Sequence, residues 1–524
     1  MQARLHRPAS LFLLLAASGP ALIGILPAQA PITADFVTAV VERAQQQFDD
    51  TGLALAVVQD GEVVAAAAAG ERSEGVALTT GSLFNIASCT KAFTAAGVAL
   101  LVQEHRLAWD DRVVDHIPEF RMSDPWITAH MTVRDLLSHR CGLKTFAGDL
   151  LWYGSDYEPA EVLHRIEKLP ITQSFGRQFG YQNLMYMVAG MVIERTTGQT
   201  WEQFVTDRFF LPLQMTHTRA AAQLLPADAD KALPHIDGQP IVDHEFVAGK
   251  PAASIYSSVD ELTAWMRMLL DGGRWQGEPI LAVDSLREMW RPHVAIGGGS
   301  GASTADFKSY GLGWFLSLEG DKKVVEHDGG MPGFLSKVSL IPADRFGFVV
   351  LNNSNDGIVN EAIKRAIFKT RAGGDGLAEL GRIAAIARRI HAGEATKTAQ
   401  REANRHEGTK PSLELAAYAG SYSDEAYGPA EVTLEGDQLQ LVLLPSRRRL
   451  FGAMKHWHHD TFRVDLPDRF LPFALIRFDL DHTGAISGFG IDCPIADFDF
   501  GALDFKRTES VAEARGRRTA PAGR

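Results

Sequence analysis

The amino-acid sequence predicts an α/β protein with an antiparallel sheet and flanking helices, followed by a smaller all-β domain. Two observations predict the first part. A strand-like hairpin stands near the start, at residues 53–70, and strand-like runs return only after residue 310, with helical segments between them. A third observation predicts the all-β part, because short alternating runs joined by turn residues follow Pro411. The 524 residues suffice for both domains.

The hairpin at residues 53–70 consists of two apolar, β-compatible runs that meet at Asp60 and Gly61. Asp-Gly between such runs is a strong hairpin signal, because both central positions of the turn need a positive φ. The sheet is therefore expected to begin with two antiparallel neighbours.

Two helices are predicted next. Residues 88–103 are apolar on nearly all sides, which is typical of a helix buried in a domain interior. Residues 131–143 form the second helix, in which Thr132 and Asp135 have capping-box spacing and Gly142 suits the left-handed residue beyond the C-terminus. Further helices are expected at 161–168, 184–197, 201–209, 262–270 and 285–290, and further strands at 310–318, 334–342 and 346–353.

The last third of the chain changes character twice. Residues 369–410 are charged and rich in alanine, which predicts a helical linker. Residues 411–508 then form short strands that pair across Gly436 and turn again at 482–484. Strands of this spacing suit a small antiparallel barrel or a sandwich.

The first thirty residues have an export pattern. Arg4 and Arg7 precede an apolar run at 11–26, which Gly19 and Pro20 interrupt, and small residues follow up to the expected cleavage site after residue 30. A membrane anchor is the alternative, but the run is shorter than the ~20 residues that a span needs. We therefore expect residues 1–30 to be a signal peptide, the mature protein to be secreted or periplasmic without a membrane span, and residues 509–524 to be a disordered tail.

Composition excludes several classes of function. A net charge of −12 argues against nucleic-acid binding, which needs a concentrated face of Lys and Arg. Cys89, Cys141 and Cys493 allow at most one disulfide and lack metal-ligand spacing, so we expect no disulfide scaffold, metal or cofactor.

Three short motifs carry the chemistry. Ser88 stands three residues before Lys91, so a helix would put both side chains on one face, at an N-terminus that favours developing negative charge. Such a pair arises by chance about once in a chain of this length. Tyr181 and Asn183 then stand two apart before a helical segment, and the run His327–Gly330 opens a late strand.

In this order and spacing, S-x-x-K, Y-x-N and H-x-G resemble the serine β-lactamase-like family, which includes class C β-lactamases, D,D-peptidases, D-aminopeptidases and related esterases. The resemblance covers about residues 36–368, which predicts a catalytic domain at 31–368 with a mostly helical subdomain beside the sheet. Residues 413–428 look like the lipocalin-like barrel that is appended to many such hydrolases.

The resemblance implies a role for each motif residue. Ser88 would attack a carbonyl carbon while Lys91 and Tyr181 remove its proton, and Asn183 would orient the substrate carbonyl and Lys91. The backbone N–H groups of Ser88 and Gly330 would stabilise the oxyanion. Because Lys and Tyr both titrate near pH 10 in water, we expect the charge of one to shift the pKa of the other.

One departure bears on the substrate. β-lactamases and many D,D-peptidases carry K-[ST]-G where this chain has His327, Asp328 and Gly329. If His327 packs toward Ser88, Asp328 should line the groove and repel a substrate carboxylate. We therefore expect an exported serine hydrolase that acts on a D-amino-acid peptide or a small ester rather than on penicillin. A true β-lactamase, a non-hydrolytic protein that binds penicillin, peptidoglycan or a partner, and a homo-oligomer stay open.

Several other residues have ordinary explanations. Ser138 and His139 would point apart on a helix, so a structural role is expected. Residues 456–460, His-Trp-His-His-Asp, are read as a solvated loop rather than a metal site. Cys89 is expected to be a small buried hydrophobic residue. Residues 298–302 lack the last glycine of the G-x-S-x-G elbow, which disfavours an α/β-hydrolase.

Overall fold

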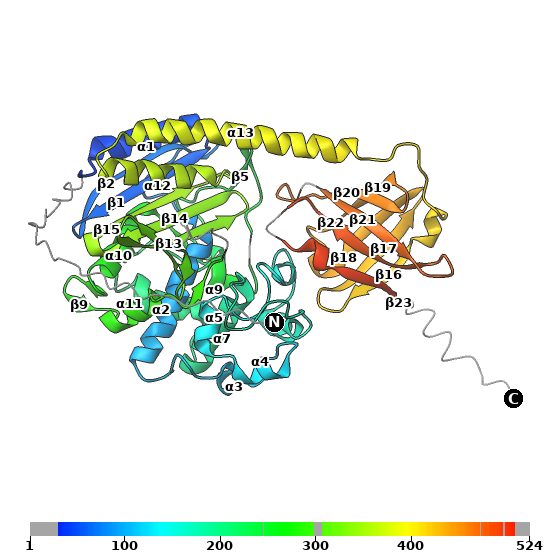
Figure 1. Cartoon of the computed structure of the whole chain (residues 1–524), viewed down its shortest axis with the longest axis horizontal. Helices are drawn as coiled ribbons and strands as arrows, with labels where there is room; N and C mark the ends of the chain where they lie inside the picture. The colour runs from blue at the N-terminus through cyan, green and yellow to red at the C-terminus, as the bar shows by residue number, and fades with distance from the viewer. Residues whose placement is uncertain (1–29, 245, 298–306, 472, 496–497, 509–524) are drawn as a thin grey trace, which may run out of the picture.

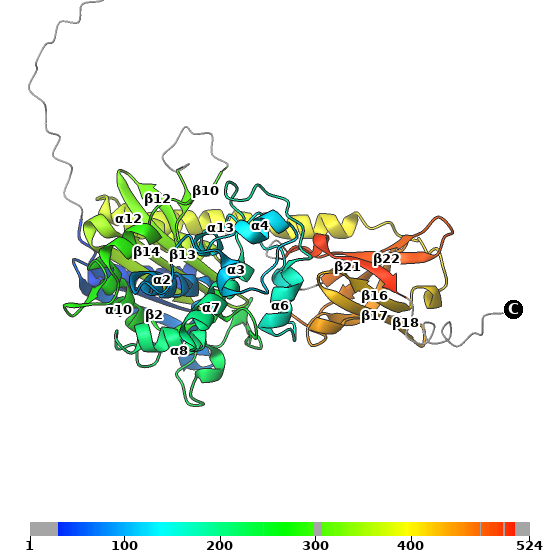
Figure 2. The same cartoon turned by 90° about the horizontal axis from the view of Figure 1, so that it is seen from below.

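The computed structural model describes residues 30–244, 246–297, 307–471, 473–495 and 498–508. Figure 1 shows a larger α/β body and a smaller barrel at the other end of the molecule, with the long helix α13 (Gly376–Ala403) running from one to the other. Figure 2, seen at a right angle, shows the same two bodies side by side. Three segments from the sequence analysis lie outside the described residues. They are the expected signal peptide apart from residue 30, the motif at 298–302 and the tail expected at 509–524.

The central sheet of the larger body has nine strands, and every pairing in it is antiparallel. Strands from the two ends of the domain meet in its middle, where Leu55 pairs with Val350. The predicted α/β architecture, closed by distant parts of the chain, is thus confirmed. Its strands, in spatial order, are β10 (Val294–Ala295), β11 (Ser309–Tyr310), β12 (Phe315–Glu319), β13 (Lys322–Met331), β14 (Phe334–Ile341), β15 (Phe346–Asn352), β1 (Gly52–Gln59), β2 (Glu62–Ser73) and β3 (Val76–Ala77).

Turn chemistry explains one correct strand prediction and one wrong one. The hairpin of β1 and β2 is confirmed, because Asp60 and Gly61 have φ of 54° and 86°. The single strand predicted at 310–318 is wrong, since β11 and β12 pair with each other as a hairpin. Gly313 turns the chain there with a φ of 81°, and a Cβ on Gly311 would lie 2.2 Å from the Met289 carbonyl oxygen.

The sheet buries both faces because alternate residues of β1 point to opposite sides. Leu53, Leu55 and Val57 pack on the side of α1 (Ala34–Gln47) and α12 (Ile358–Arg371), which lie together with α13 over one face in Figure 1. On the other face α10 (Val259–Leu270) packs on β1 and β15, and α2 (Thr90–Gln103) shares the buried core of that side with Ala54 and Ala56 of β1. All of α2 up to Leu101 is buried, which confirms the predicted interior helix.

Helices from the middle of the chain pack around the far side of α2. These are α3 (Val113–His116), α4 (Pro125–His130), α5 (Val133–Leu137), α6 (Pro159–Ile166), α7 (Asn183–Thr197), α8 (Trp201–Val205), α9 (Lys250–Ala253) and α11 (Val283–Met289). The capping box of Thr132 and Asp135 is confirmed. The helix is shorter than predicted, because His139 has a left-handed φ of 56° and turns its ring into the core; Gly142 therefore does not cap it.

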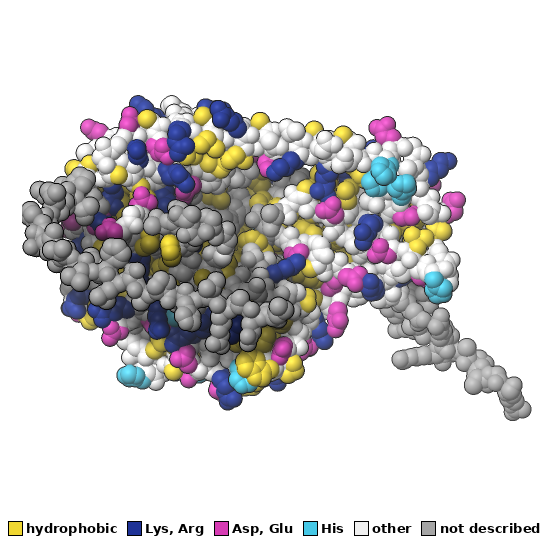
Figure 3. Space-filling view, in the orientation of Figure 1, with side chains coloured by type: hydrophobic (Ala, Val, Ile, Leu, Met, Phe, Trp, Pro, Cys, Tyr) yellow, Lys and Arg dark blue, Asp and Glu magenta, His cyan; other side chains and the backbone are white. Residues whose placement is uncertain are grey.

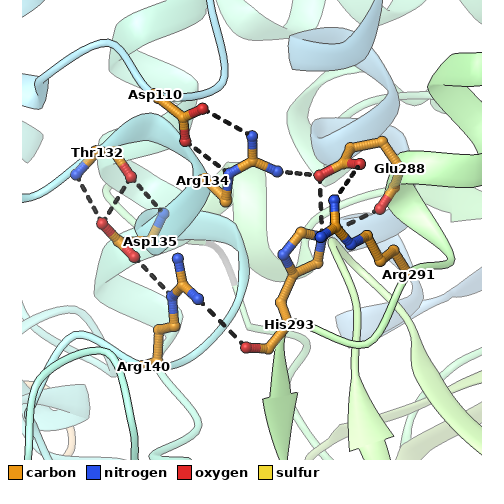
Figure 4. Close-up of polar contacts among 8 residues, drawn as sticks. All are labelled: Asp110, Thr132, Arg134, Asp135, Arg140, Glu288, Arg291 and His293. Carbon is orange, nitrogen blue, oxygen red and sulfur yellow. Dashed lines mark hydrogen bonds and ion pairs between the residues drawn. The ribbon is translucent and has the colours of Figure 1, made fainter.

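A charged network ties this helical layer to the edge of the sheet (Figure 4). Arg134 of α5 bonds both Asp110 and Glu288 of α11, and His293 Nε2 lies 3.5 Å from the Glu288 carboxylate. Arg140 donates to the carbonyl oxygen of His293 over 3.3 Å. The network fixes α5 and α11 relative to β10, so the two layers that enclose the site are held by charge as well as by packing.

The C-terminal part is a closed antiparallel barrel, so the barrel is confirmed over the sandwich. The turn at Gly436 pairs Glu435 with Gln438, as predicted, and aromatic rings such as Tyr422, Phe478 and Phe489 pack together in its core. The strands are β16 (Gly420–Asp424), β17 (Gly428–Glu435), β18 (Gln438–Leu443), β19 (Phe451–His458), β20 (Thr461–Asp465), β21 (Phe473–Leu480), β22 (Ile486–Asp492) and β23 (Asp504–Thr508).

The surface carries charges of both signs, and the cysteines lie in the interior. Acidic and basic side chains are interspersed over both bodies on the face shown in Figure 3. Cys89, Cys141 and Cys493 are all free and buried. Within the described residues, no helix has both the length and the apolar character needed to cross a bilayer.

Candidate active site

A cavity of about 510 Å³ lies at the end of β13, between the sheet, the helical layer and the barrel. Seven of the eight residues singled out in the sequence line it, namely Ser88, Tyr181, Asn183, His327, Asp328, Gly329 and Gly330. The eighth, Lys91, lies fully buried directly behind Ser88. Residues from three separate parts of the chain are thus brought to one place.

Ser88 stands in a short 3₁₀ turn, Ala87–Cys89, that leads into α2. Ala87 has a φ of 46°, which is strained for a residue with a side chain. Its N–H donates to Asn85 Oδ1 over 2.6 Å, and this bond holds the turn. The serine is therefore presented at the N-terminal end of a buried helix, as the sequence predicts.

Lys91 contacts the serine directly. Its Nζ donates to Ser88 Oγ over 2.9 Å, to Asn183 Oδ1 over 2.6 Å and to the Ala252 carbonyl oxygen over 3.0 Å. Burial lowers the pKa of Lys91 to about 7, although the Asp149 carboxylate acts in the opposite direction. Near neutral pH a large fraction of the molecules therefore has an uncharged amine next to the serine hydroxyl.

The pKa of Tyr181 is shifted in the opposite direction to that of Lys91. Burial raises the pKa of its hydroxyl well above the usual value, and an interaction with Ser88 opposes this only in part. Lys91 Nζ lies 4.8 Å from the centre of its ring. The expectation that the charges of Lys91 and Tyr181 shift each other is wrong, because burial of each group is the larger cause.

Asp149 was not singled out in the sequence. Its carboxylate accepts a hydrogen bond from Asn183 Nδ2 over 2.6 Å and another from Trp152 Nε1 over 3.0 Å. The first bond fixes the Asn183 amide so that its oxygen faces Lys91. No motif marks Asp149, which lies 34 residues from its partner, so nothing in the sequence could have found it.

His139 packs behind Tyr181, with ring centroids 4.2 Å apart. Its Nδ1 accepts the backbone N–H of Gln182 over 3.0 Å, so the neutral ring carries its proton on Nε2. Burial lowers the pKa of His139 well below its usual value. It supports the tyrosine ring, which agrees with the structural role expected for it.

The His327 ring is neutral, and both of its nitrogens take part in hydrogen bonds. Its Nδ1 donates to the Asp328 carbonyl oxygen over 2.6 Å, so its Nε2 accepts from the Tyr310 hydroxyl over 2.9 Å. Burial lowers the pKa of His327 to about 3. His327 is therefore unsuited to remove the serine proton. Tyr310 was not among the site residues predicted from the sequence, which placed it only in an expected strand at 310–318.

Asp328 is paired with a lysine. β13 and β14 place Lys337 opposite Asp328, and their charged atoms lie 2.5 Å apart. The Asp328 side chain is 60% exposed, whereas Lys337 is buried and its pKa is raised by its acidic neighbours. Asp328 lines the cavity, as predicted, but Lys337 offsets its charge, which weakens the repulsion expected for a substrate carboxylate. Lys337 could have been found by counting the register outward from the turn at Pro332 and Gly333.

The end of β13 passes close to the serine turn. A Cβ on Gly329 would lie 2.4 Å from the Ile86 carbonyl oxygen and 2.2 Å from Ser336 Oγ, so only glycine fits. The pairing of β13 with β12 ends at Glu326. Among the described strands, the rest of β13 pairs only with β14, so its other edge is open. Backbone groups on the open edge can therefore face the cavity, where they suit an oxyanion.

Two other features of the sequence, Cys89 and the histidines at 456–458, take no part in this site. The Cys89 thiol contacts Ser336 and the His327 carbonyl oxygen, and burial raises its pKa to about 12, which leaves no thiolate to act as a nucleophile. His456 and His458 belong to β19, so the predicted solvated loop is wrong there. The part of the chain that the structure describes holds no cluster of side chains suited to a metal ion.

Comparisons with known proteins identify the family of the larger part of the chain. Residues 38–369 match the Beta-lactamase family, and residues 404–507 match DUF3471, a domain of unknown function. The chain belongs to the Beta-lactamase family. Protein flp of Staphylococcus aureus (strain NCTC 8325 / PS 47) is 26% identical over 334 residues, which cover 63% of this chain and 64% of that protein. The match thus spans less than two thirds of that relative.

Two solved structures share the fold. The octameric penicillin-binding protein homologue from Pyrococcus abyssi is 19% identical, with a TM-score of 0.57 over 90% of this chain and 100% of that one. The D-amino acid amidase from Ochrobactrum anthropi SV3 is 23% identical, with a TM-score of 0.52 over 67% of this chain and 98% of that one. At these identities the likeness establishes the architecture alone.

Proposed function

We propose that the protein is a serine hydrolase that forms an acyl-enzyme at Ser88 and cleaves a small amide or ester. The observation that carries the proposal is the 2.9 Å contact between Lys91 Nζ and Ser88 Oγ, because burial lowers the pKa of this amine to about 7 and its neutral form can accept the serine proton. A buried amine that is partly neutral at working pH is a suitable proton acceptor for a serine hydroxyl.

The residues suggest how the proton moves. Lys91 takes the proton of Ser88 while Oγ bonds to the substrate carbonyl carbon, and the backbone N–H groups of Ser88 and Gly330 bind the oxyanion. Tyr181 keeps its proton at neutral pH, so it can hand that proton to the leaving amine or alkoxide and recover one from Lys91. A water molecule then repeats the sequence on the acyl-enzyme and releases the acid.

A D-aminoacyl amide or a small ester suits the site better than a penicillin. His327 stands where carboxylate-binding relatives have a lysine, and the cation of Lys337 is occupied by Asp328. One of the solved proteins that share the fold is a D-amino acid amidase, which supports the same choice.

This choice of substrate can be tested by Asp328→Thr. The change removes the nearest carboxylate from Lys337, which keeps only the longer contact of 3.9 Å with Glu361, so turnover of carboxylate-bearing esters should rise relative to neutral esters, and more so at low salt. An unchanged ratio between the two kinds of ester would show that this pair does not face the substrate.

A fluorophosphonate probe tests the nucleophile. Wild-type protein should gain one probe mass on the peptide that contains Ser88, and Ser88→Ala should remain unlabelled. Cys89→Ala is the matched control and should still react, because its thiol is buried and protonated. Hydrolysis of D-aminoacyl amides, short esters and a chromogenic cephalosporin then ranks the substrates. Absence of both labelling and hydrolysis would favour a non-hydrolytic binding protein instead.

Two wider features complete the proposal. The export pattern at 1–30 supports a secreted or periplasmic protein, and N-terminal sequencing of the mature chain should begin at Pro31. The Pyrococcus abyssi homologue that shares the fold is octameric, which supports a homo-oligomer here. Light scattering of the purified protein measures this state directly.

A further inference from the structure

The cavity that contains Ser88 is closed on one side by the barrel. Phe470 lies in the connection between β20 and β21, and Phe498 lies in the connection between β22 and β23. Both side chains line the same cavity as Ser88 and Tyr181. Two residues from the C-terminal domain therefore form part of the wall around the proposed nucleophile.

Polar bonds hold this wall in place. The Tyr153 hydroxyl donates to Asp468 Oδ2 over 3.0 Å, and the Arg449 guanidinium lies 3.3 Å from the same oxygen. The other oxygen of Asp468 accepts the backbone N–H of Phe470 over 3.0 Å. The Tyr153 ring also packs on Phe498, with centroids 4.3 Å apart. The buried carboxylate thus fixes the barrel loop against the catalytic domain.

A second set of contacts joins the barrel to the turn that carries Asp149. The backbone N–H of Gly148 donates to the Tyr427 hydroxyl over 3.2 Å, and Tyr157 donates to the Tyr427 carbonyl oxygen over 3.2 Å. Arg165 donates to the neighbouring carbonyl oxygen of Ala426 over 2.8 Å. The same apolar core includes buried residues of both domains. These contacts make the barrel a fixed part of the cavity wall.

The chemistry of the wall is aromatic and carries no free cation. The described lining residues include neither lysine nor arginine, and of its two carboxylates Asp149 binds Asn183 and Trp152 while Asp328 is paired with Lys337. Flat apolar walls of this kind favour flat apolar groups, because both surfaces leave water. Its aromatic members are Phe146, Trp152, Tyr153, Phe179, Tyr181, Phe315, Phe470 and Phe498.

We propose that the barrel completes the substrate pocket, and that the site takes an amide or ester that lacks a carboxylate and carries an aryl group beside the scissile bond. Phe470 and Phe498 bind the aryl group and so determine specificity. This inference rests on the proposed hydrolase function for the reaction, but the pocket itself can be tested without turnover.

The test measures binding in the Ser88→Ala protein by fluorine NMR titration. Two neutral amides serve as probes, N-(4-fluorobenzyl)acetamide and the small N-(2,2,2-trifluoroethyl)acetamide. Phe470→Ala and Phe498→Ala should each weaken binding of the aryl probe about tenfold, as expected for loss of a ring that packs on a buried ligand. Binding of the small probe should change less than about twofold.

The control is Phe451→Ala, which removes a 40% exposed ring of the same barrel outside the cavity lining and should leave both probes unaffected. Phe470→Leu keeps an apolar side chain and serves as the second variant if an alanine variant fails to fold, as judged by its melting temperature; it should weaken aryl binding by a smaller factor. Equal losses for both probes, or aryl binding unchanged in all variants, would overturn the proposal.

Turnover separates this inference from the proposed function. In protein with Ser88 intact, kcat/KM for benzyl acetate relative to ethyl acetate should fall about tenfold in Phe470→Ala. If neither ester is hydrolysed and no probe labels Ser88, the hydrolase proposal fails, yet the binding difference between the two amides still decides whether the barrel forms the pocket.

Discussion

The lowered pKa of Lys91 predicts how the rate of hydrolysis should depend on pH. If the neutral amine of Lys91 is the base, kcat/KM should fall about tenfold per pH unit below pH 7 and level off above it. Asp149→Asn removes a carboxylate that stabilises the charged amine, so the pKa of Lys91 should fall and the midpoint of the profile should move to lower pH.

The size of the shift follows from the geometry. Two hydrogen bonds of 2.6 Å, through Asn183, join Lys91 to Asp149. The charges are therefore about 7 Å apart, which at an effective dielectric constant of about 20 corresponds to about 2 kcal/mol, or between about one and two pH units.

The assay is the pH profile of kcat/KM for a neutral ester, whose own ionisation does not contribute. Asp149→Asn is expected to lower the rate as well, because Asn183 loses a fixed acceptor, so the midpoint is the readout. Trp152→Phe is the matched control: it removes a donor to Asp149 but keeps the carboxylate, and its midpoint should stay in place. A midpoint in Asp149→Asn that does not move, or moves to higher pH, would refute Lys91 as the base.

Three further predictions follow from the same contacts. Lys91→Ala and Tyr181→Phe should each lower kcat by about 10²- to 10⁴-fold, with the double variant barely worse than the worse single one; losses that multiply would show independent roles. Burial raises the pKa of Asp50 to about 7 in the folded protein, so the free energy of unfolding should fall as pH rises from about 4 to 7. In urea unfolding, Asp50→Asn should therefore raise the free energy of unfolding by up to about 4 kcal/mol at pH 8 and by little at pH 4. An equal gain at both pH values would contradict this. Gly329→Ala should abolish activity through its clash with the Ile86 carbonyl oxygen, whereas Gly330→Ala, whose Cβ would have its nearest contact at 3.6 Å, should keep most of it.

The sequence by itself determined the features that depend on neighbours in the chain. The turn at Asp60 and Gly61 needs only the conformations of two residues, and the buried helix at 88–103 needs only its apolar composition. The contact between Ser88 and Lys91 follows from helical spacing over three residues. Local patterns of this kind were sufficient for the α/β order, the barrel strands and the motif residues.

Local patterns failed where a distant contact overrode them. The helix predicted at 131–143 ends at Leu137, because His139 turns inward to pack on Tyr181. The strand predicted at 310–318 folds back, because Gly313 leaves the extended conformation and the chain approaches Met289. In each case tertiary packing was worth more than the propensity of a few residues.

Only the tertiary structure decided the electrostatics and the walls of the site. The pKa of Lys91 is lowered by burial, which is a property of everything packed around it and has no signature in the residues beside it. Asp149 reaches Asn183, Lys337 reaches Asp328, and Phe470 reaches the cavity of Ser88 from another domain. The sequence contained the reacting groups, because their spacing is local, whereas their protonation states and the shape of the pocket arise from contacts between segments that only the fold brings together.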